Sequence, residues 1–405
     1  MNILFLTDQD IAPLRGGVKR GTHIISRAFM DKYNLKCYLA YVEGFTTCQT
    51  SVFNDKIQIT DHDTLVQLEE FIVKHEIDII ILQKMLHKKY RILPVLETIA
   101  KRRFCKLLFA LHFSPEHSMI VLSIENIVNN IKYGKSLTMK AANLCKLAAY
   151  PVYKSIKYYQ LRHYYKEIYD KFDRVVLLSK RFIPIYARYA RIAKSNKLVA
   201  IGNPVSFEEQ ISQNEIAEKK QEVLIVSRFE EKQKKLLRAL KIWHKIERDK
   251  ELSDWKLVIV GFGSWEDRYK KYAAKLQLKN VSFEGGPKDP LPYYKRASIF
   301  MMTSAHEGLG MVLLESQQMG VVPMAFDSFA SLHDVIEDGY NGLIIPNADL
   351  DAYAERLIWL MKNKNKREEM ARNAVESCRR NSSENIVGQW IDLFHTVLSK
   401  DSLVK

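Results

Sequence analysis

The chain has 405 residues, of which 47% are apolar and 27% charged, a composition typical of a globular protein long enough for two domains. No apolar run reaches about 18 residues, and the opening MNILFLTDQD is too short and too soon acidic for a signal peptide, so we expect a cytosolic protein. The five cysteines form no C-x-x-C pair, which argues against a zinc site or a disulfide framework. The net charge of +15 indicates an anionic partner: nucleic acid, an acidic membrane surface or a phosphorylated ligand.

The first 115 residues alternate short apolar runs with amphipathic stretches such as TLVQLEEFIVKHE (64–76). Buried parallel strands are predicted at NILFL (2–6), IDIIIL (77–82) and KLLFAL (106–111). This β-α-β alternation predicts a doubly wound α/β sheet.

Two candidate binding positions follow strands of this first sheet. Gly16 and Gly17 come after the first strand and just before an amphipathic stretch, where bare backbone could approach a phosphate or a sugar, although a plain turn is the alternative. His112 directly follows the strand 106–111 and could bond a sugar hydroxyl or act as a base, although a structural histidine fits the same position.

The segment from about 118 to 173 interrupts the alternation and is predicted to be a helical insertion. Between Lys132 and Arg174 there are ten Lys or Arg, three acidic residues and eight of the chain's 20 tyrosines. Strand signals resume at RVVLLS (174–179) and KLVAIGNPV (197–205). The polar stretch 206–222 is then interpreted as a linker or domain boundary.

A second β-α alternation follows, with strands predicted at VLIVSRF, WKLVIVGFG, VSFEGG, SIFMMTS, VVPMAF and GLIIP. We therefore predict an N-terminal domain over 1–206, a C-terminal domain over 207–384, and a final helix over 385–405 that could pack back across the N-terminal domain. Within this half, GFG (261–263) lacks the full G-x-G-x-x-G dinucleotide pattern and is interpreted as a turn.

The first candidate site in this half is SRFEEKQKKL. Arg228 directly follows a strand and Lys234 comes six residues later, so two cations at a strand end could neutralise a diphosphate. A solvated basic loop is the alternative, because further lysines lie in the same stretch.

The second candidate is SAHEGLGMVLLESQQMG. A strand, the turn Gly308-Leu309-Gly310 and a helix ended by Gly320 succeed one another, and a helix N-terminus attracts phosphate. Glu315 would reach a hydroxyl pair such as a ribose, while Glu307 would lie beyond the phosphates. A buried helix with two incidental glutamates is the alternative.

Two Asp-x-Asp stretches, DQD (8–10) and DHD (61–63), have no supporting ligand cluster in the sequence. We expect no metal at either.

Together these stretches resemble the retaining glycosyltransferases of the GT-B fold, of the family 4 type that builds bacterial surface polysaccharides such as capsule and O-antigen. SRFEEKQKKL, WKLVIVGFG, SIFMMTSAHEGLGMVLLESQQMGVVPMAFD and DVIEDGYNGLIIP carry the resemblance and cover 223–346 almost continuously. GGVKR, His112, and VVLLSKRF leading to IGNPV extend it more loosely into the N-terminal half. The implied fold is two Rossmann-like domains facing a cleft.

The resemblance implies a role for each candidate residue. Arg228 and Lys234 would contact the donor diphosphate, Glu307 would lie beside the donor sugar, and Glu315 would bind the ribose. Further donor contacts would come from Gly16, Gly17 and the backbone of Gly308, Leu309 and Gly310, and His112 would face donor sugar and acceptor. No metal or other cofactor is implied. Leu309 stands where an aromatic is common in the family, which affects donor preference.

The implied activity is transfer of a hexose-type sugar from a nucleotide diphosphate sugar, UDP-linked or GDP-linked, to a lipid-linked glycan. The basic, tyrosine-rich segment 132–174 would then dock on the inner face of the plasma membrane, because tyrosine and lysine favour anionic interfaces. Helices packed on the first domain with solvated lysines are the alternative, and we expect no nucleic-acid partner because no nucleic-acid motif accompanies the segment. A nucleotide-sugar epimerase and a non-catalytic nucleotide-sugar or nucleic-acid binding protein are the alternative functions.

Overall fold

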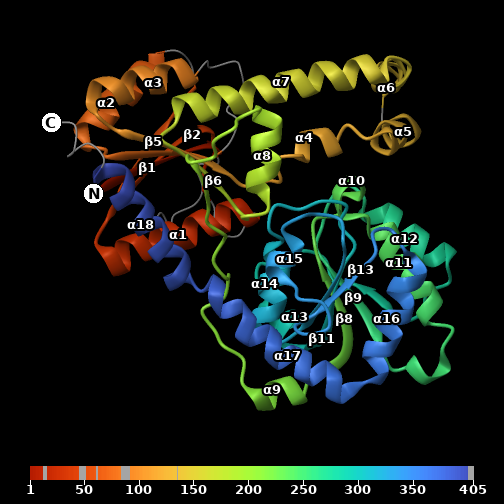
Figure 1. Cartoon of the computed structure of the whole chain (residues 1–405). Helices are drawn as coiled ribbons and strands as arrows, with labels where there is room; N and C mark the ends of the chain where they lie inside the picture. The colour runs from red at the N-terminus through yellow and green to blue at the C-terminus, as the bar shows by residue number, and fades with distance from the viewer. Residues whose placement is uncertain (12–15, 45–51, 61–62, 84–91, 135, 400–405) are drawn as a thin grey trace. The chain divides into compact units, whose positions relative to one another are not determined.

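The computed structural model describes the chain apart from residues 12–15, 45–51, 61–62, 84–91, 135 and 400–405. The chain divides into two compact units (Figure 1). Unit 1 comprises Met1–Pro204 with Ser383–Lys405, and unit 2 comprises Val205–Ser382. Each unit is built on its own parallel sheet, so the predicted doubly wound α/β class is confirmed in both.

Unit 1 has a seven-stranded sheet in the order β3-β2-β1-β4-β5-β6-β7, the strand order of a doubly wound fold with one strand added. Its strands are β1 (Asn2–Gln9), β2 (Lys36–Glu43), β3 (Asp55–Gln58), β4 (Ile79–Leu82), β5 (Lys106–Leu111), β6 (Arg174–Leu177) and β7 (Leu198–Ala200). β2 and β3 are absent from the sequence prediction, although β2 contains the apolar run CYLAYV; β3, with the sequence DKIQ, is short and only half-buried.

The helices of unit 1 cover this sheet on both faces (Figure 1). They are α1 (Gly17–Tyr33), α2 (Asp63–Lys74), α3 (Ile92–Arg103), α4 (His117–Ile120), α5 (Ile124–Tyr133), α6 (Leu137–Ala148), α7 (Tyr150–Lys171), α8 (Phe182–Ala190) and α18 (Ser383–Ser399). The C-terminal helix α18 buries Trp390 and Phe394 in the core of unit 1, with the Phe394 ring 5.4 Å from that of Phe29 on α1. None of the described helices is long and apolar enough to cross a membrane.

The predicted insertion over about 118–173 forms α4 to α7, between the adjacent strands β5 and β6, and its basic, tyrosine-rich part 132–174 comprises the end of α5 with α6 and α7. Its C-terminal part is anchored: Tyr165 is buried, donates a hydrogen bond to the carbonyl of Pro115 at 2.9 Å and stacks on Tyr186 with ring centres 4.5 Å apart. The Tyr169 hydroxyl likewise bonds the side chain of Asn196 at 2.9 Å. These tyrosines therefore hold the segment to the rest of unit 1.

Unit 2 has a six-stranded parallel sheet in the order β10-β9-β8-β11-β12-β13, again a doubly wound order. Its strands are β8 (Lys220–Val226), β9 (Lys256–Val260), β10 (Val281–Phe283), β11 (Ala297–Met302), β12 (Val322–Phe326) and β13 (Leu343–Ile345). Its helices are α9 (Gln213–Ala217), α10 (Glu231–Lys234), α11 (Leu236–Ile246), α12 (Glu266–Lys275), α13 (Leu291–Arg296), α14 (Met311–Gln318), α15 (Leu332–Val335), α16 (Leu350–Lys362) and α17 (Lys364–Cys378), with 3-10 turns at Lys250–Leu252 and Arg379–Asn381.

The stretch 206–222, interpreted from sequence as a linker, is partly regular structure. Ser212 caps α9 in a capping box with Glu215, in which each residue bonds the other's backbone. The first three residues of β8 belong to the same stretch, because Lys220 to Glu222 extend the strand beyond its apolar run.

Candidate functional site

Two loops meet at the carboxyl edge of the unit 2 sheet, where its strand order reverses. β8 ends at Val226 and leads to Arg228 and α10, while the neighbouring strand β11 ends at Met302 and leads to Glu307 and α14. In open α/β sheets, ligands bind at this kind of switch point.

Backbone and side-chain bonds join the two loops. Lys235 takes a left-handed conformation (φ 52°) between α10 and α11, and Thr303 donates its hydroxyl to the carbonyls of Lys234 and Lys235 at 3.0 and 3.2 Å. The amide of Ala305 donates to the carbonyl of Gln233 at 2.7 Å. The loop after β11 therefore holds α10, and with it Lys234, in place.

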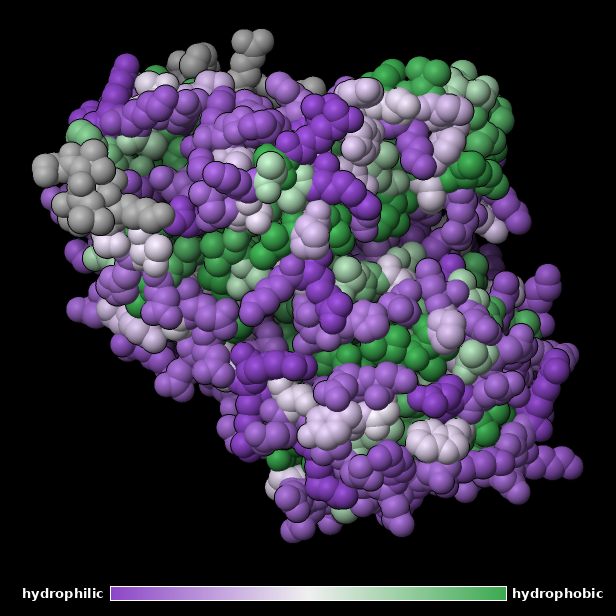
Figure 2. Space-filling model, in the orientation of Figure 1, coloured by the Kyte–Doolittle hydropathy of each residue, from purple (hydrophilic) through white to green (hydrophobic). Residues whose placement is uncertain are grey.

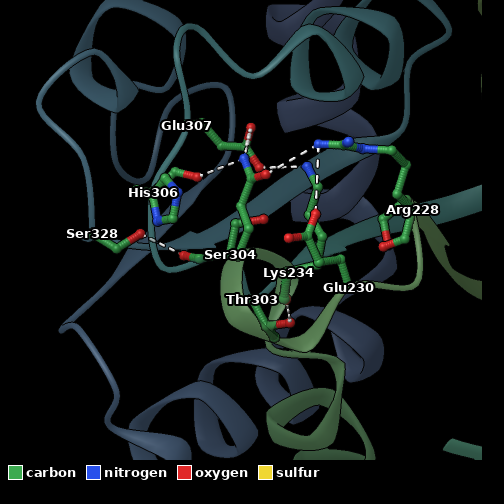
Figure 3. Close-up of polar contacts among 10 residues, drawn as sticks. Arg228, Glu230, Lys234, Thr303, Ser304, His306, Glu307 and Ser328 are labelled. Atoms are coloured by element: carbon green, nitrogen blue, oxygen red, sulfur yellow. Dashed lines mark hydrogen bonds and ion pairs between the residues drawn. The ribbon is translucent and has the colours of Figure 1, made fainter. Parts of the chain in front are cut away.

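A polar network connects the predicted residues (Figure 3). Lys234 Nζ lies 2.6 Å from Glu307 Oε1, and both side chains are nearly buried, 12% and 10% exposed. Gln233 Nε2 donates to Glu307 Oε2 at 3.2 Å and to the carbonyl of His306 at 3.1 Å, while its Oε1 accepts from Arg228 at 3.2 Å. Lys234 and Glu307 thus form one charged pair, and Gln233 links it to Arg228.

Gln233 is a residue that the sequence reasoning missed. Its position between the predicted Arg228 and Lys234 was the available signal, together with an amide that can donate and accept at once. Arg228 itself is largely exposed and lies 3.9 Å from Glu230, so its guanidinium faces solvent at the edge of the network. A solvent-facing guanidinium beside a held lysine suits an anion with several oxygens.

Two serines of the segment after β12 hold the glycine turn before α14 through hydrogen bonds. Ser328 donates to the carbonyl of Ser304 at 2.6 Å, and Ser331 to that of Gly308. Gly310 has φ 78°, a conformation that favours glycine, and α14 begins directly after it with no acidic residue in its first turn. The N–H groups at the start of a helix favour an anion, here on the side of Glu307 and Lys234. Leu309 is buried, so only its backbone is available there.

Glu315 lies on α14 and is only 2% exposed. Its Oε1 accepts a hydrogen bond from Ser206 at 2.8 Å and its Oε2 accepts one from Tyr294 at 2.9 Å. The structure thus shows a carboxylate that joins three segments of unit 2, and ribose binding stays a prediction.

Gly16, Gly17 and His112 belong to unit 1, whereas the other predicted residues come together in unit 2. Gly16 has φ 82° and caps the N-terminus of α1, where Gly17 is the first helical residue. His112 follows β5 and is buried, and neither ring nitrogen has a hydrogen-bond partner among the described residues. Burial lowers the pKa of His112 to about 4, so its imidazole is neutral at pH 7.

The Asp-x-Asp stretches contribute no visible metal ligand set. Asp10 accepts from Lys56 Nζ at 3.0 Å, and residues 61 and 62 of the second stretch lie outside the described residues. The described part of the chain contains no group of three or more His, Cys, Asp or Glu placed to hold a metal.

Residues 206–377 match the family described as Glycosyl transferases group 1. The matched residues make up a little under half of the chain. The match covers nearly all of unit 2 and includes the whole Arg228–Glu307 network. It confirms the resemblance seen in the sequence.

Curated relatives match about half of this chain. An N-acetylgalactosaminyltransferase of Campylobacter jejuni, whose name gives a glycan on PP-undecaprenol as its substrate, is 29% identical over 52% of this chain and 57% of its own length. The amylovoran biosynthesis glycosyltransferase AmsD of Erwinia amylovora is 28% identical over 48% of this chain and 55% of its own length. This chain therefore spans only a little over half the length of these relatives.

Solved structures match nearly the whole chain, including both units. HepE of Anabaena, solved with UDP and glucose, aligns with a TM-score of 0.69 at 17% identity, over 98% of this chain and 100% of HepE. A glycosyltransferase from Rickettsia africae also has a TM-score of 0.69, at 14% identity and 98% coverage of both chains. These likenesses confirm the GT-B fold.

Proposed function

We propose that this chain is a retaining, metal-independent glycosyltransferase that moves a hexose-type sugar from a nucleotide diphosphate sugar to a lipid-linked glycan in bacterial cell-surface polysaccharide synthesis. A UDP-sugar is the favoured donor and a GDP-sugar the second candidate. The family match, the C. jejuni and E. amylovora relatives, and the UDP and glucose held by HepE support this proposal.

The observation that carries the proposal is the Lys234–Glu307 pair, linked through Gln233 to Arg228 and next to the α14 N-terminus. Arg228, Lys234 and the turn Gly308–Gly310 would bind the diphosphate and stabilise the departing nucleotide. Glu307 would lie at the sugar end of the diphosphate and Glu315 at the ribose.

The pairing of Glu307 also bears on the stereochemical course. A carboxylate bonded by both Lys234 and Gln233 is held in place and is a poor nucleophile, so a covalent glycosyl intermediate on Glu307 is disfavoured. Front-face departure of the nucleotide and attack by the acceptor on the same side fits this arrangement. In that reaction the protein supplies positioning and charge. The donor and acceptor contacts expected of Gly16, Gly17 and His112 stay a prediction from the sequence.

Thermal-shift titration with UDP-sugars and GDP-sugars tests donor binding, because a ligand that binds only the folded state raises the melting temperature. We expect one nucleotide sugar to stabilise the wild type, and the shift to shrink in Lys234→Met. Lys270→Met is the matched control, because Lys270 pairs with Glu266 of its own helix α12 and not with Glu307. No shift with any nucleotide sugar would overturn the proposed donor class.

Product analysis separates transfer from the alternative chemistries. We expect free nucleoside diphosphate to accumulate only when a polyprenyl-diphosphate glycan is present, and the new linkage to keep the donor's anomeric configuration. Isomerised donor without nucleotide release would instead indicate an epimerase. Activity that persists in excess EDTA is the expected outcome for a metal-independent enzyme, and loss of activity restored by Mg²⁺ or Mn²⁺ would refute it.

The segment α4 to α7 is the proposed membrane-docking surface. From residue 126 to 166 the sequence has eight Lys or Arg and no acidic residue. Several aliphatic side chains there face solvent, foremost Leu137 at 84% and Val152 at 63% exposure, together with Ile124, Leu144 and Ile156. Figure 2 shows apolar side chains gathered at the α5 and α6 end of unit 1. Exposed aliphatic residues among many lysines suit an anionic bilayer, where each cation contributes about 1 kcal/mol.

Co-sedimentation with vesicles tests this surface. We expect binding to vesicles containing phosphatidylglycerol at low salt, weaker binding at high salt, and little binding to phosphatidylcholine alone. Leu137→Ser combined with Val152→Ser should weaken it, whereas Val66→Ser, which removes an equally exposed valine on α2, should not. Equal binding by the double variant and the wild type would refute the assignment.

A further inference from the structure

The loop after β9 presents an exposed aromatic ring beside the site. Phe262 lies between Gly261 and Gly263 at the carboxyl edge of the unit 2 sheet, and its side chain is 67% exposed. β9 neighbours β8, whose loop carries Arg228. A large exposed aromatic that the described core of unit 2 does not use is available to a ligand.

The loop that carries Phe262 is held tightly to the loops on both sides. The amide of Phe229 donates to the carbonyl of Phe262 at 2.8 Å, and the amide of Gly261 donates to that of Gly285 at 2.6 Å. A Cβ at Gly261 would lie 1.8 Å from the carbonyl oxygen of Ser227, so only glycine allows this approach. Phe262 is therefore presented by a fixed backbone, next in space to the residue that follows Arg228.

One part of the Phe262 ring rests on bare backbone. A Cβ placed on Gly286 would lie 2.2 Å from Phe262 Cδ1, which shows that the ring covers this glycine. The chain continues from Gly286 into α13, whose Tyr294 donates a hydrogen bond to Glu315, the predicted ribose ligand. The same short segment thus connects the ring with the predicted ribose position.

We infer that Phe262 is the surface on which the base of the donor nucleotide stacks, an inference that rests on the proposed function. In the strand order β10-β9-β8-β11, Phe262 lies on the β9 and β10 side of Arg228, and Glu307 lies on the β11 side. A nucleotide sugar with its diphosphate at Arg228 and Lys234 would then point its sugar toward Glu307 and its base toward Phe262. Any base offers a π-face, so the ring adds affinity and leaves the choice of base to neighbouring polar groups.

Calorimetric titration of the full chain with UDP and GDP tests this inference. Phe262→Ala and Phe262→Leu should weaken nucleoside diphosphate binding by about five- to a hundredfold, the range of aromatic–base stacking, and Phe262→Trp should retain affinity. In Phe262→Trp, the added fluorescence should be quenched by the nucleoside diphosphate and unchanged by inorganic pyrophosphate, which has no base.

The matched control is Tyr340→Ala. Tyr340 is an exposed aromatic of unit 2 in the segment that leads into β13, so it lies toward the opposite edge of the parallel sheet. Its removal should leave nucleotide affinity unchanged. Wild-type affinity in both Phe262→Ala and Phe262→Leu, with Lys234→Met still impaired, would overturn the stacking role and leave the proposed function standing. Failure of the wild type itself to bind any nucleoside diphosphate would instead overturn the proposed function, and this inference with it.

Discussion

Acidification should destabilise unit 1 through His112 more than through any exposed histidine. The imidazole is buried directly after β5, and neither nitrogen is hydrogen-bonded within the described residues, so nothing there stabilises its protonated form. Its pKa falls from 6.5 to about 4 in the folded chain. Below about pH 6.5, His112 therefore binds a proton in the unfolded chain but not in the folded chain.

This difference in pKa sets the direction and the size of the stability change. Stability from a neutral His112 is fully present above pH 6.5 and is lost as the pH falls toward 4. A shift of about 2.5 pKa units corresponds to about 3 kcal/mol in total at 1.36 kcal/mol per unit. Between about pH 7.5 and 5.5, where acid unfolding by carboxylates is small, the loss should be about 1.4 kcal/mol.

Urea unfolding followed by circular dichroism at several pH values measures this loss. His112→Gln has no titrating side chain at this position. Between about pH 7.5 and 5.5 its free energy of unfolding should therefore fall by about 1.4 kcal/mol less than that of the wild type. His163→Gln is the control, because it removes an exposed histidine of the same unit and should keep the wild-type dependence. Identical pH dependence in wild type and His112→Gln would refute the reasoning, since it would mean that the buried ring accepts its proton as readily as the unfolded chain does.

Three further predictions concern the unit 2 site. Lys234→Met and Glu307→Gln should each destabilise the fold, because each substitution leaves the partner charge nearly buried and unpaired. In urea unfolding, the double variant should lose about 2 kcal/mol less stability than the sum of the two single losses, and additive losses would contradict the pair. Gln233→Ala should lower donor turnover about tenfold with less than about 1 kcal/mol lost in stability, because Arg228 and Glu307 lose their bridge; unchanged kinetics would exclude that positioning role. Gly310→Ala should lower the free energy of unfolding by about 1–2 kcal/mol, because alanine is strained in the left-handed conformation, and should reduce donor affinity. Thermal unfolding and donor titration measure both effects, and wild-type values in both would show that the turn tolerates alanine.

The strands with long apolar runs were predictable from sequence, because burial on both faces of a parallel sheet demands them. β8 and β11 of unit 2 and β1 and β5 of unit 1 are examples. β3 was missed because DKIQ is short and has no apolar run. β2 does contain the apolar run CYLAYV and was overlooked, but the contacts that cover its Tyr38, made by Phe71 of α2 and His75 after it, are revealed by no local pattern.

The candidate residues Arg228, Lys234, Glu307 and Glu315 were likewise visible from their place after strands and around a helix start. Their partners were not. Residues 73 positions apart form the Lys234–Glu307 pair, and the bridge by Gln233 exists only because β8 and β11 are neighbours in the sheet. The hydrogen bond from Ser206 to Glu315, 109 positions away, is equally invisible in the local sequence.

The sequence by itself therefore determined the two doubly wound halves, the place of the glycine turn and the chemical type of the site residues, because these follow from local periodicity and from which side chains stand at strand ends. The tertiary structure alone decided which charges pair, that the tyrosines Tyr165 and Tyr169 anchor the helical segment while Leu137 and Val152 face solvent, and that Phe262 stands exposed beside Arg228. The physical reason is that burial and pairing are properties of neighbours in space, and strand order brings together residues that the chain keeps far apart.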